Sequence, residues 1–192
     1  MADEISNALL RRDAESFTRP MPTDPQAMME ELMRAEKKAH PDLTARKNAV
    51  AARLGTTKRT VERYLGGKLK RPQHAMREAL EREVAKTWQP IVRKRARRAA
   101  AASGGITVDT RARFGYHAPI GSTDDPRERQ LTVHLSPAYA ARLFDAQAAG
   151  ASDQVLRDIV AEGFQEEYFK DGGRAAGLEV EFTDIRYFDV EF

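Results

Sequence analysis

The chain has 192 residues, with 32 Lys or Arg, 29 Asp or Glu and no cysteine. The lack of cysteine excludes disulfides, thiol catalysis and zinc sites built on thiolates. No apolar run approaches the roughly 20 residues that span a membrane, and the first residues lack the apolar core of a secretory signal. Residues 1–100 carry a net charge of +10 and residues 101–192 a net charge of −7. We therefore expect a cytoplasmic protein of two domains, of which the basic one suits nucleic acid.

The start of the chain predicts a short amphipathic helix through about Phe17. Three prolines between Thr18 and Pro25 then indicate a linker. From Gln26 a further helix is predicted, because apolar residues return at helical spacing. We expect residues 1–25 to be an N-terminal helix and linker, and residues 26–102 to be a helical domain. The apolar stripe of its first helix consists of Met28, Met29, Leu32 and Met33.

Residues 49–65, AVAARLGTTKRTVERYL, have the pattern of two short helices joined by a sharp turn. Gly55 falls where the chain must reverse, and Thr56 or Thr57 is placed to cap the next helix. That helix, residues 58–65, turns a basic face outward, as a helix that docks in the DNA major groove does. A plain helical hairpin with solvated charges is the alternative. The expected helix-turn-helix core is Val50, Ala51, Leu54, Gly55, Val61 and Tyr64.

Basic residues continue after this motif. Between Arg46 and Arg98 there are 17 Lys or Arg and 4 Glu, a density that favours contact with phosphates. Residues 68–72 predict a basic loop, and residues 93–98, of which five are cationic, predict a basic helix after Pro90. A solvated face is the alternative for this last segment. The residues expected to contact DNA are Lys58, Arg59, Arg63, Lys68, Lys70, Arg71, Arg93, Lys94, Arg95, Arg97 and Arg98.

The second half predicts a small α+β domain over residues 103–192, with a mainly antiparallel sheet. Alternation of apolar and polar residues indicates strands, and apolar periodicity indicates two helices. Residues 131–164 also fit the order of a ribbon-helix-helix unit, but that strand lacks outward basic residues to read bases. The expected strands are residues 106–110, 130–135, 178–182 and 188–192, and the expected helices are residues 137–149 and 152–169, the second ended by Asp171–Gly173.

The motifs of common catalytic sites are missing from the sequence. It contains neither a phosphate-binding GxxxxGK[ST] loop nor a nucleophile elbow GxSxG. We expect no metal site, although Asp109, Asp124 and Asp125 leave open an enzyme that processes DNA ends. The four histidines are scattered without metal-ligand spacing: His40, His74, His117 and His134.

Residues 113–127 predict an exposed loop, because the segment contains two prolines, two glycines and the adjacent hydroxyls Ser122 and Thr123. A loop of this kind can be presented to a partner. Read alone, its hydroxyls serve to satisfy backbone amides in a polar turn.

From residue 17 onward the chain resembles the telomere-protecting terminal proteins of linear actinobacterial (Streptomyces-type) chromosomes and plasmids. The resemblance is weakest in the Met-rich helix. The stretches that carry it are PheThrArgPro (17–20), ThrValGluArgTyr (60–64), LeuGluArgGluVal (80–84), TrpGlnPro (88–90), AspThrArgAlaArg (109–113), AlaProIleGlySerThrAsp (118–124), TyrAlaAlaArgLeuPheAspAlaGln (139–147) and GlyLeuGluValGluPheThrAspIle (177–185).

The resemblance implies a protein that becomes covalently joined to the 5′ end of linear DNA and primes synthesis there. The priming hydroxyl of the family falls on Thr123, with Ser122 as second choice and Thr110 and Tyr116 as weaker candidates. The chain would not be an enzyme, and a DNA polymerase would bring the divalent metal and the deoxynucleotide. The implied partners are telomeric DNA, as 3′ overhang or terminal duplex, a telomere-associated protein and the polymerase, at the nucleoid; a homo-oligomer stays open.

A noncovalent helix-turn-helix regulator is the alternative function. A plasmid replication protein belongs to the same class. In either, the acidic half would serve for dimerisation or for binding an effector.

Overall fold

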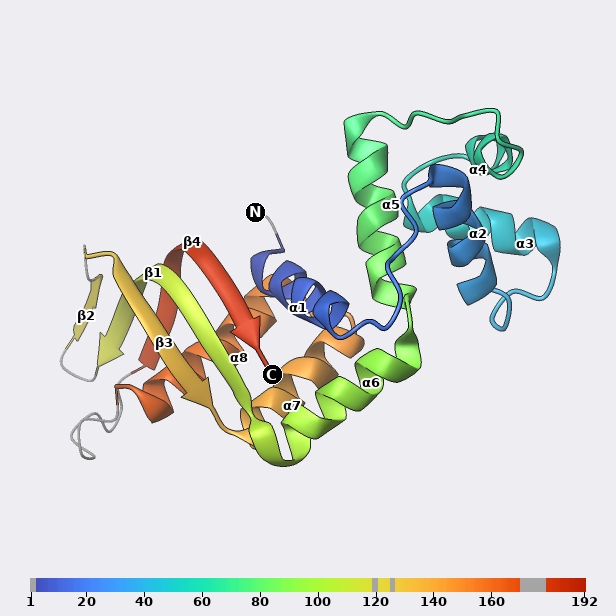
Figure 1. The fold of residues 1–192 in the computed structure, drawn as a ribbon. Helices are drawn as coiled ribbons and strands as arrows, with labels where there is room; N and C mark the ends of the chain where they lie inside the picture. Colours follow the sequence, from blue (N-terminus) through green and yellow to red (C-terminus); the bar gives the residue numbers. More distant parts are fainter. Residues whose placement is uncertain (1–2, 119–120, 125–126, 170–178) are drawn as a thin grey trace. The chain divides into compact units, whose positions relative to one another are not determined.

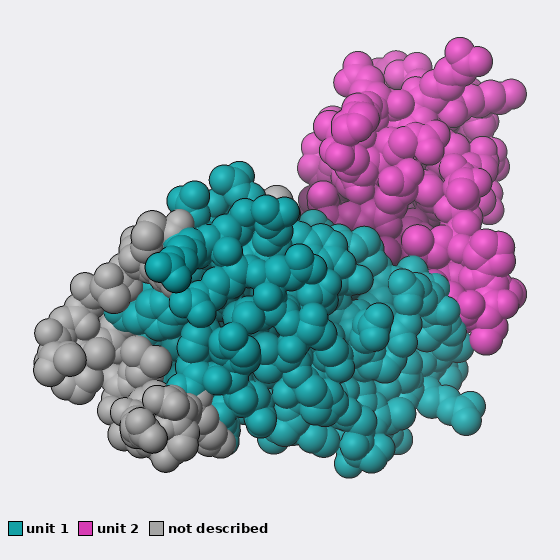
Figure 2. Space-filling model, turned by 60° about the vertical axis from the view of Figure 1, so that its left-hand side comes forward, with its two compact units in different colours: residues 1–16, 91–192 teal, residues 17–90 magenta. Residues whose placement is uncertain are grey.

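The computed structural model describes residues 3–118, 121–124, 127–169 and 179–192 (Figure 1). Helices and an antiparallel sheet give the expected α+β class. The chain divides into two compact units, drawn in different colours in Figure 2. Unit 1 comprises residues 1–16 and 91–192, and unit 2 comprises residues 17–90.

Unit 2 consists of four helices around one apolar core. They are α2 (Pro25–Ala35), α3 (Leu43–Arg53), α4 (Lys58–Leu65) and α5 (His74–Thr87). The side chains of Asp24, Asp42 and Thr57 cap α2, α3 and α4 by accepting backbone N–H bonds. The core is formed by Met28, Met29, Leu32, Met33, Val50, Ala51, Leu54, Val61, Tyr64, Ala79, Leu80 and Val84.

The turn between α3 and α4 follows the predicted geometry. Gly55 has φ +61°, a conformation that favours glycine, and Thr57 Oγ1 accepts a bond from Thr60 N at 3.2 Å. The bounds of α4 and the burial of the five side chains expected around Gly55 are confirmed. The chain leaves α4 through Gly67, which has φ +66°.

In unit 1 the other strands that the structure describes all pair with β1 (Ile106–Ala118). The strand β4 (Glu179–Glu191) runs along one edge of β1, and β3 (Arg129–Leu135) and β2 (Gly121–Asp124) follow one another along its other edge, all antiparallel. Two helices, α7 (Pro137–Ala148) and α8 (Asp153–Glu167), contact strands of this sheet and share its core. Although β3, α7 and α8 follow the order of a ribbon-helix-helix unit, β3 is bonded to β1 of its own chain.

The expected exposed loop at residues 113–127 is wrong for its first part, because β1 continues to Ala118. Phe114 and Tyr116 extend the apolar alternation and pair with Phe182 and Val180 of β4. Residues 121–124 form β2 and complete a hairpin. The two strands expected at 178–182 and 188–192 are one strand, whose register shifts beside Ala112. The helix end expected at residues 171–173 lies outside the described residues.

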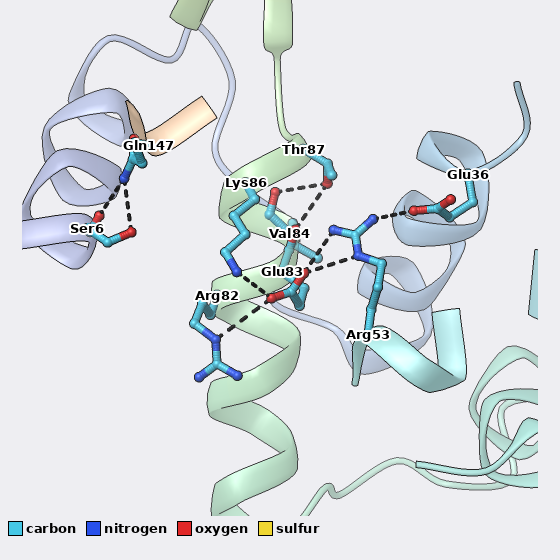
Figure 3. A network of polar contacts seen from close by, with 9 residues as sticks. All are labelled: Ser6, Glu36, Arg53, Arg82, Glu83, Val84, Lys86, Thr87 and Gln147. Atoms are coloured by element: carbon cyan, nitrogen blue, oxygen red, sulfur yellow. Dashed lines mark hydrogen bonds and ion pairs between the residues drawn. The ribbon is translucent and has the colours of Figure 1, made fainter. Parts of the chain in front are cut away.

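The N-terminal helix α1 (Glu4–Glu15) belongs to unit 1 rather than to a separate N-terminal segment. Ile5 and Leu9 are fully buried in the core of unit 1, and Asp153 Oδ1 accepts bonds from Ile5 N and Ser6 N at 3.1 and 3.2 Å. Gln147 Nε2 donates to Ser6 Oγ at 3.0 Å (Figure 3). In the sequence, unit 2 is therefore an insertion between α1 and the remaining residues of unit 1.

The basic helix α6 (Pro90–Ala99) likewise lies in unit 1 from Ile91 on. It continues into a π-helical turn, η1 (Ala100–Gly104), which leads to β1. The compact units thus change at residues 16/17 and 90/91, whereas the sequence predicts boundaries at 25/26 and 102/103. The observed boundaries follow from contacts between residues that are far apart in the sequence. The amino-acid composition of a segment does not reveal such contacts.

Replacing Leu9 by alanine tests the place of α1. Because Leu9 is fully buried in unit 1, Leu9→Ala should lower the free energy of unfolding by about 2–5 kcal/mol. Glu15→Ala, at an exposed position of the same helix, is the control and should change it by less than about 0.5 kcal/mol. Urea denaturation of both variants is the measurement, and equal stabilities would show that α1 does not belong to the core.

Candidate nucleic-acid interface

The helix α4 has one buried and one charged face. Val61 and Tyr64 are buried in unit 2. The charged residues of α4 are exposed, and they lie within the two turns of helix that follow the turn at Gly55. We call these residues, Lys58, Arg59, Glu62 and Arg63, the α4 face.

The single carboxylate of the α4 face is paired across the turn. Lys47 Nζ of α3 donates to Glu62 Oε1 at 3.0 Å. This bond lowers the pKa of Glu62, against a smaller opposing effect of desolvation, so the carboxylate is charged at neutral pH. Glu62 is 41% exposed and Lys47 only 21%, which leaves the carboxylate open to a ligand while its cation stays largely covered.

A network of charged residues holds the end of α3 just before the turn (Figure 3). Arg53 of α3 donates to Glu83 of α5 at 2.9 and 3.1 Å and to Glu36, at the end of α2, at 2.6 Å. Lys86 donates to the other oxygen of Glu83 at 2.7 Å. These contacts tie α2, α3 and α5 together, so they fix the direction in which the chain enters α4.

Burial and hydrogen bonding shift the pKa of Glu83 in opposite directions. Burial raises the pKa of Glu83, but the hydrogen bonds from Lys86 and Arg53 outweigh it and hold the pKa below the ordinary value of 4.5. Burial likewise lowers the pKa of Arg53, and the bonds to Glu36 and Glu83 raise it overall. Each charge is therefore stabilised by its partners.

Two of the stretches that carry the family resemblance meet in unit 2. Trp88 Nε1 and Gln89 Nε2 both donate to the carbonyl oxygen of Arg19, at 3.2 and 2.9 Å, and Thr18 donates to Gln89 Oε1. The Arg19 guanidinium lies 5.6 Å from the centre of the Trp88 ring. Gln89 has φ +41°, a strained conformation for a residue with a side chain, and these bonds hold it at the end of α5.

The basic residues of α6 do not form one exposed surface. Arg97 donates to both oxygens of Asp13, at 2.9 and 2.6 Å, and to Gln147, and it lies over the Phe144 ring. Asp13 is fully buried and needs Arg97 as its partner inside unit 1, so Arg97 is not available to contact DNA as the sequence predicts. Burial lowers the pKa of Arg93, which is half-buried. The remaining cations of α6 are exposed: Lys94, Arg95 and Arg98.

The basic segment between α4 and α5 also lies at the surface of unit 2. Lys68, Lys70 and Arg71 are exposed, and the backbone N–H of Lys68 donates to the Arg63 carbonyl at 2.9 Å. These cations therefore follow directly on the α4 face.

The hydroxyls proposed as nucleotide acceptors have different surroundings. Thr110 is fully buried and its hydroxyl donates to the Tyr187 carbonyl at 2.8 Å, so this hydroxyl is not available to receive a nucleotide. Tyr116 packs edge-on against Phe169, with ring centres 5.5 Å apart. The backbone of Thr123 lies in β2 opposite Tyr116, and that of Ser122 opposite His117. The side chains of Ser122 and Thr123 lie outside the described residues.

Of the three carboxylates proposed for metal binding, Asp109 has a side chain within the described residues. Asp109 accepts a bond from Thr132 Oγ1 at 3.0 Å, and Asp125 and the side chain of Asp124 lie outside the described residues. Within residues whose side chains the structure describes, no group of three His, Asp or Glu is placed to hold a metal ion.

Comparison with protein-family models, with curated proteins and with solved structures gives no match for this chain. The resemblance to terminal proteins therefore stays a prediction. Among the helices described here, none is both long and apolar enough to cross a membrane.

Sequence reasoning missed the residues that support the interface. Lys47 and Glu62 are 15 positions apart, and Arg53 and Glu83 are 30 apart. Helical periodicity relates residues three or four positions apart, so neither pair leaves a local signal. The only indication is that Glu83 and Arg53 are charged residues near apolar helix faces.

Replacing Glu83 by glutamine tests the network. Glu83→Gln should lower the free energy of unfolding at pH 7 by about 1–3 kcal/mol, because Arg53 and Lys86 lose an ionic partner. The folded-state pKa of Glu83 is lowered, so its contribution is complete above pH 4.5 and declines as pH falls through the folded pKa. The gap between wild type and variant should therefore narrow from pH 7 to pH 3 in urea denaturation. Glu81→Gln, half-exposed on the same helix, is the control, and a gap independent of pH would contradict this role.

Proposed function

We propose that the protein is a terminal protein of linear DNA, in which unit 2 binds the DNA end and Thr123 becomes joined to the 5′ end as primer. The observation that carries the DNA-binding part is the α4 face: a helix anchored by Val61 and Tyr64 presents Lys58, Arg59 and Arg63 to solvent after a tight turn. This arrangement matches what docking of a helix in the major groove requires.

The distribution of charge between the units supports the same assignment. Residues 17–90 hold 16 Lys or Arg and 9 Asp or Glu, whereas residues 1–16 and 91–192 together hold 16 and 20. Phosphate contact by Lys68, Lys70 and Arg71 would add to the α4 face through release of counterions. The exposed cations of α6 form a second candidate contact, in unit 1.

The priming part rests on the resemblance in residues 118–124. The Thr123 hydroxyl oxygen attacks the α-phosphorus of a deoxynucleoside triphosphate, a phosphate ester bond forms, and pyrophosphate leaves with the electrons of the broken bond. The hydroxyl proton passes to a base or to solvent, and divalent metal in the polymerase stabilises the developing charge. This chain supplies the acceptor and needs no catalytic residue of its own.

The place of Thr123 in the sheet is compatible with that use. The strand β2 has four residues and, in the part of the chain that the structure describes, pairs with β1 alone. A short edge strand has few backbone bonds to give up when it leaves the sheet, so it can enter a polymerase site at small cost. A telomere-associated protein and the polymerase are the further partners we propose.

The first test of this proposal concerns DNA binding. Arg59→Ala and Arg63→Ala should each weaken binding of the full chain to duplex DNA by about 5- to 100-fold, since each removes a contact to bases or phosphate. Lys70→Ala should reduce the steepness with which the logarithm of the affinity falls against the logarithm of the salt concentration, by about one phosphate contact. Fluorescence anisotropy at several salt concentrations is the measurement, and Arg142→Ala, which changes charge equally in unit 1, is the control. Unchanged binding by both α4 variants would exclude α4 as the contact.

The second test detects the covalent product. The full chain is incubated with a DNA polymerase, a telomeric single strand, Mg²⁺ and labelled deoxynucleotide, and label that survives denaturation is measured. Thr123→Ala should abolish the label and Thr123→Ser should keep it, because serine retains the hydroxyl; Ser122→Ala is the matched neighbour and should also keep it. Loss in Ser122→Ala alone would move the acceptor by one residue. Binding of DNA without any covalent label would instead favour the noncovalent regulator.

A further inference from the structure

The α4 face contains one carboxylate among three cations. A surface that only binds phosphates gains nothing from Glu62, because a carboxylate is repelled by the DNA backbone. Glu62 is nevertheless exposed at the middle of the helix, with Arg59 one turn before it and Arg63 next to it. This position calls for a role that a cation cannot fill.

The hydrogen-bonding chemistry of base edges offers such a role. A carboxylate only accepts hydrogen bonds. In the major groove, guanine presents acceptors, thymine an acceptor and a methyl group, and adenine a donor beside an acceptor, whereas cytosine presents its N4 amino donor. A carboxylate therefore favours cytosine over the other three bases.

We propose that Glu62 selects cytosine in the major groove, by accepting a hydrogen bond from cytosine N4, and that Lys47 is its positioning residue. The inference rests on the proposed binding of DNA by α4. The neighbouring Arg59 and Arg63 have the side chain that most often reads guanine, so the site read by α4 contains G·C pairs.

The contact with Lys47 explains how a carboxylate is tolerated there. Lys47 Nζ lies 3.0 Å from Glu62 Oε1, so its positive charge offsets the negative charge of the carboxylate and restricts the rotation of the Glu62 side chain. It contacts one carboxylate oxygen, and Oε2 has no partner among the contacts of the described residues. That second oxygen is available to a base, while the pair with Lys47 fixes where it lies.

The experiment selects binding sites from a pool of duplexes with 20 randomised base pairs, using the full chain and its Glu62→Gln variant. Wild type should enrich cytosine at one position by at least about fivefold over other bases. Because a glutamine amide matches the donor and acceptor of adenine, Glu62→Gln should change the preference at that position from cytosine to adenine. The preferences that come from the arginines should stay.

Two further variants separate recognition from folding. Glu81→Gln removes a carboxylate from α5 with the same change in charge and should leave the selected sequence unchanged. Lys47→Met should reduce the cytosine preference, and in combination with Glu62→Gln it should have no further effect at that position. A purely structural ion pair would change thermal stability but would leave base preference unchanged in all variants.

The outcomes distinguish this inference from the function on which it rests. If wild type retains no duplex, binding of duplex DNA by unit 2 is wrong and the inference falls with it. If wild type selects DNA but Glu62→Gln selects the same sequence, or if neither shows a preferred base, the role of Glu62 is wrong and DNA binding stands.

Discussion

Each compact unit contains a buried carboxylate that has to be paired with an arginine. Glu83 is paired with Arg53 in unit 2, and Asp13 with Arg97 in unit 1. Leaving such a charge without its partner costs several kcal/mol, so neither pair opens without destabilising the helices that carry it. Arg53 joins α3 to α2 and α5, and Arg97 joins α6 to α1. The direction of α4 and the place of α6 depend on these pairs.

Most of unit 2 is predictable from the sequence because its signals are local. Caps, helical periodicity and a glycine at the turn act within a few residues, and they give α4 its observed bounds. The sheet of unit 1 is decided by distant partners. Phe114 pairs with Phe182, and this contact outweighs the loop composition around residues 113–118. The role of α1 was missed for the same reason, since Asp153 caps its first turn.

The candidate site divides in the same way. The exposed cations of α4 are predictable, because helical spacing determines which residues lie on the face opposite the buried one. The burial of Arg97 is not, since its run of basic neighbours resembles a solvated face and its partner Asp13 lies 84 positions earlier. The sequence alone does not show which hydroxyls are accessible. Thr110 lies inside a strand, where its hydroxyl donates a hydrogen bond to the backbone carbonyl of Tyr187.

The insertion of unit 2 into unit 1 has a consequence for synthesis of the chain. Unit 2 is complete once residue 90 has been made, so it can fold while the ribosome is still translating. The helix α1 is synthesised before unit 2, but its contact with β4 forms only later, because Arg11 donates to the carbonyl of Phe188, 177 residues further along the chain. Until β4 has been made, the core that receives Ile5 and Leu9 is incomplete. Unit 2, which carries α4, can therefore fold before unit 1. If translation stops before β4, the released chain leaves apolar side chains of α1 exposed to proteases and chaperones.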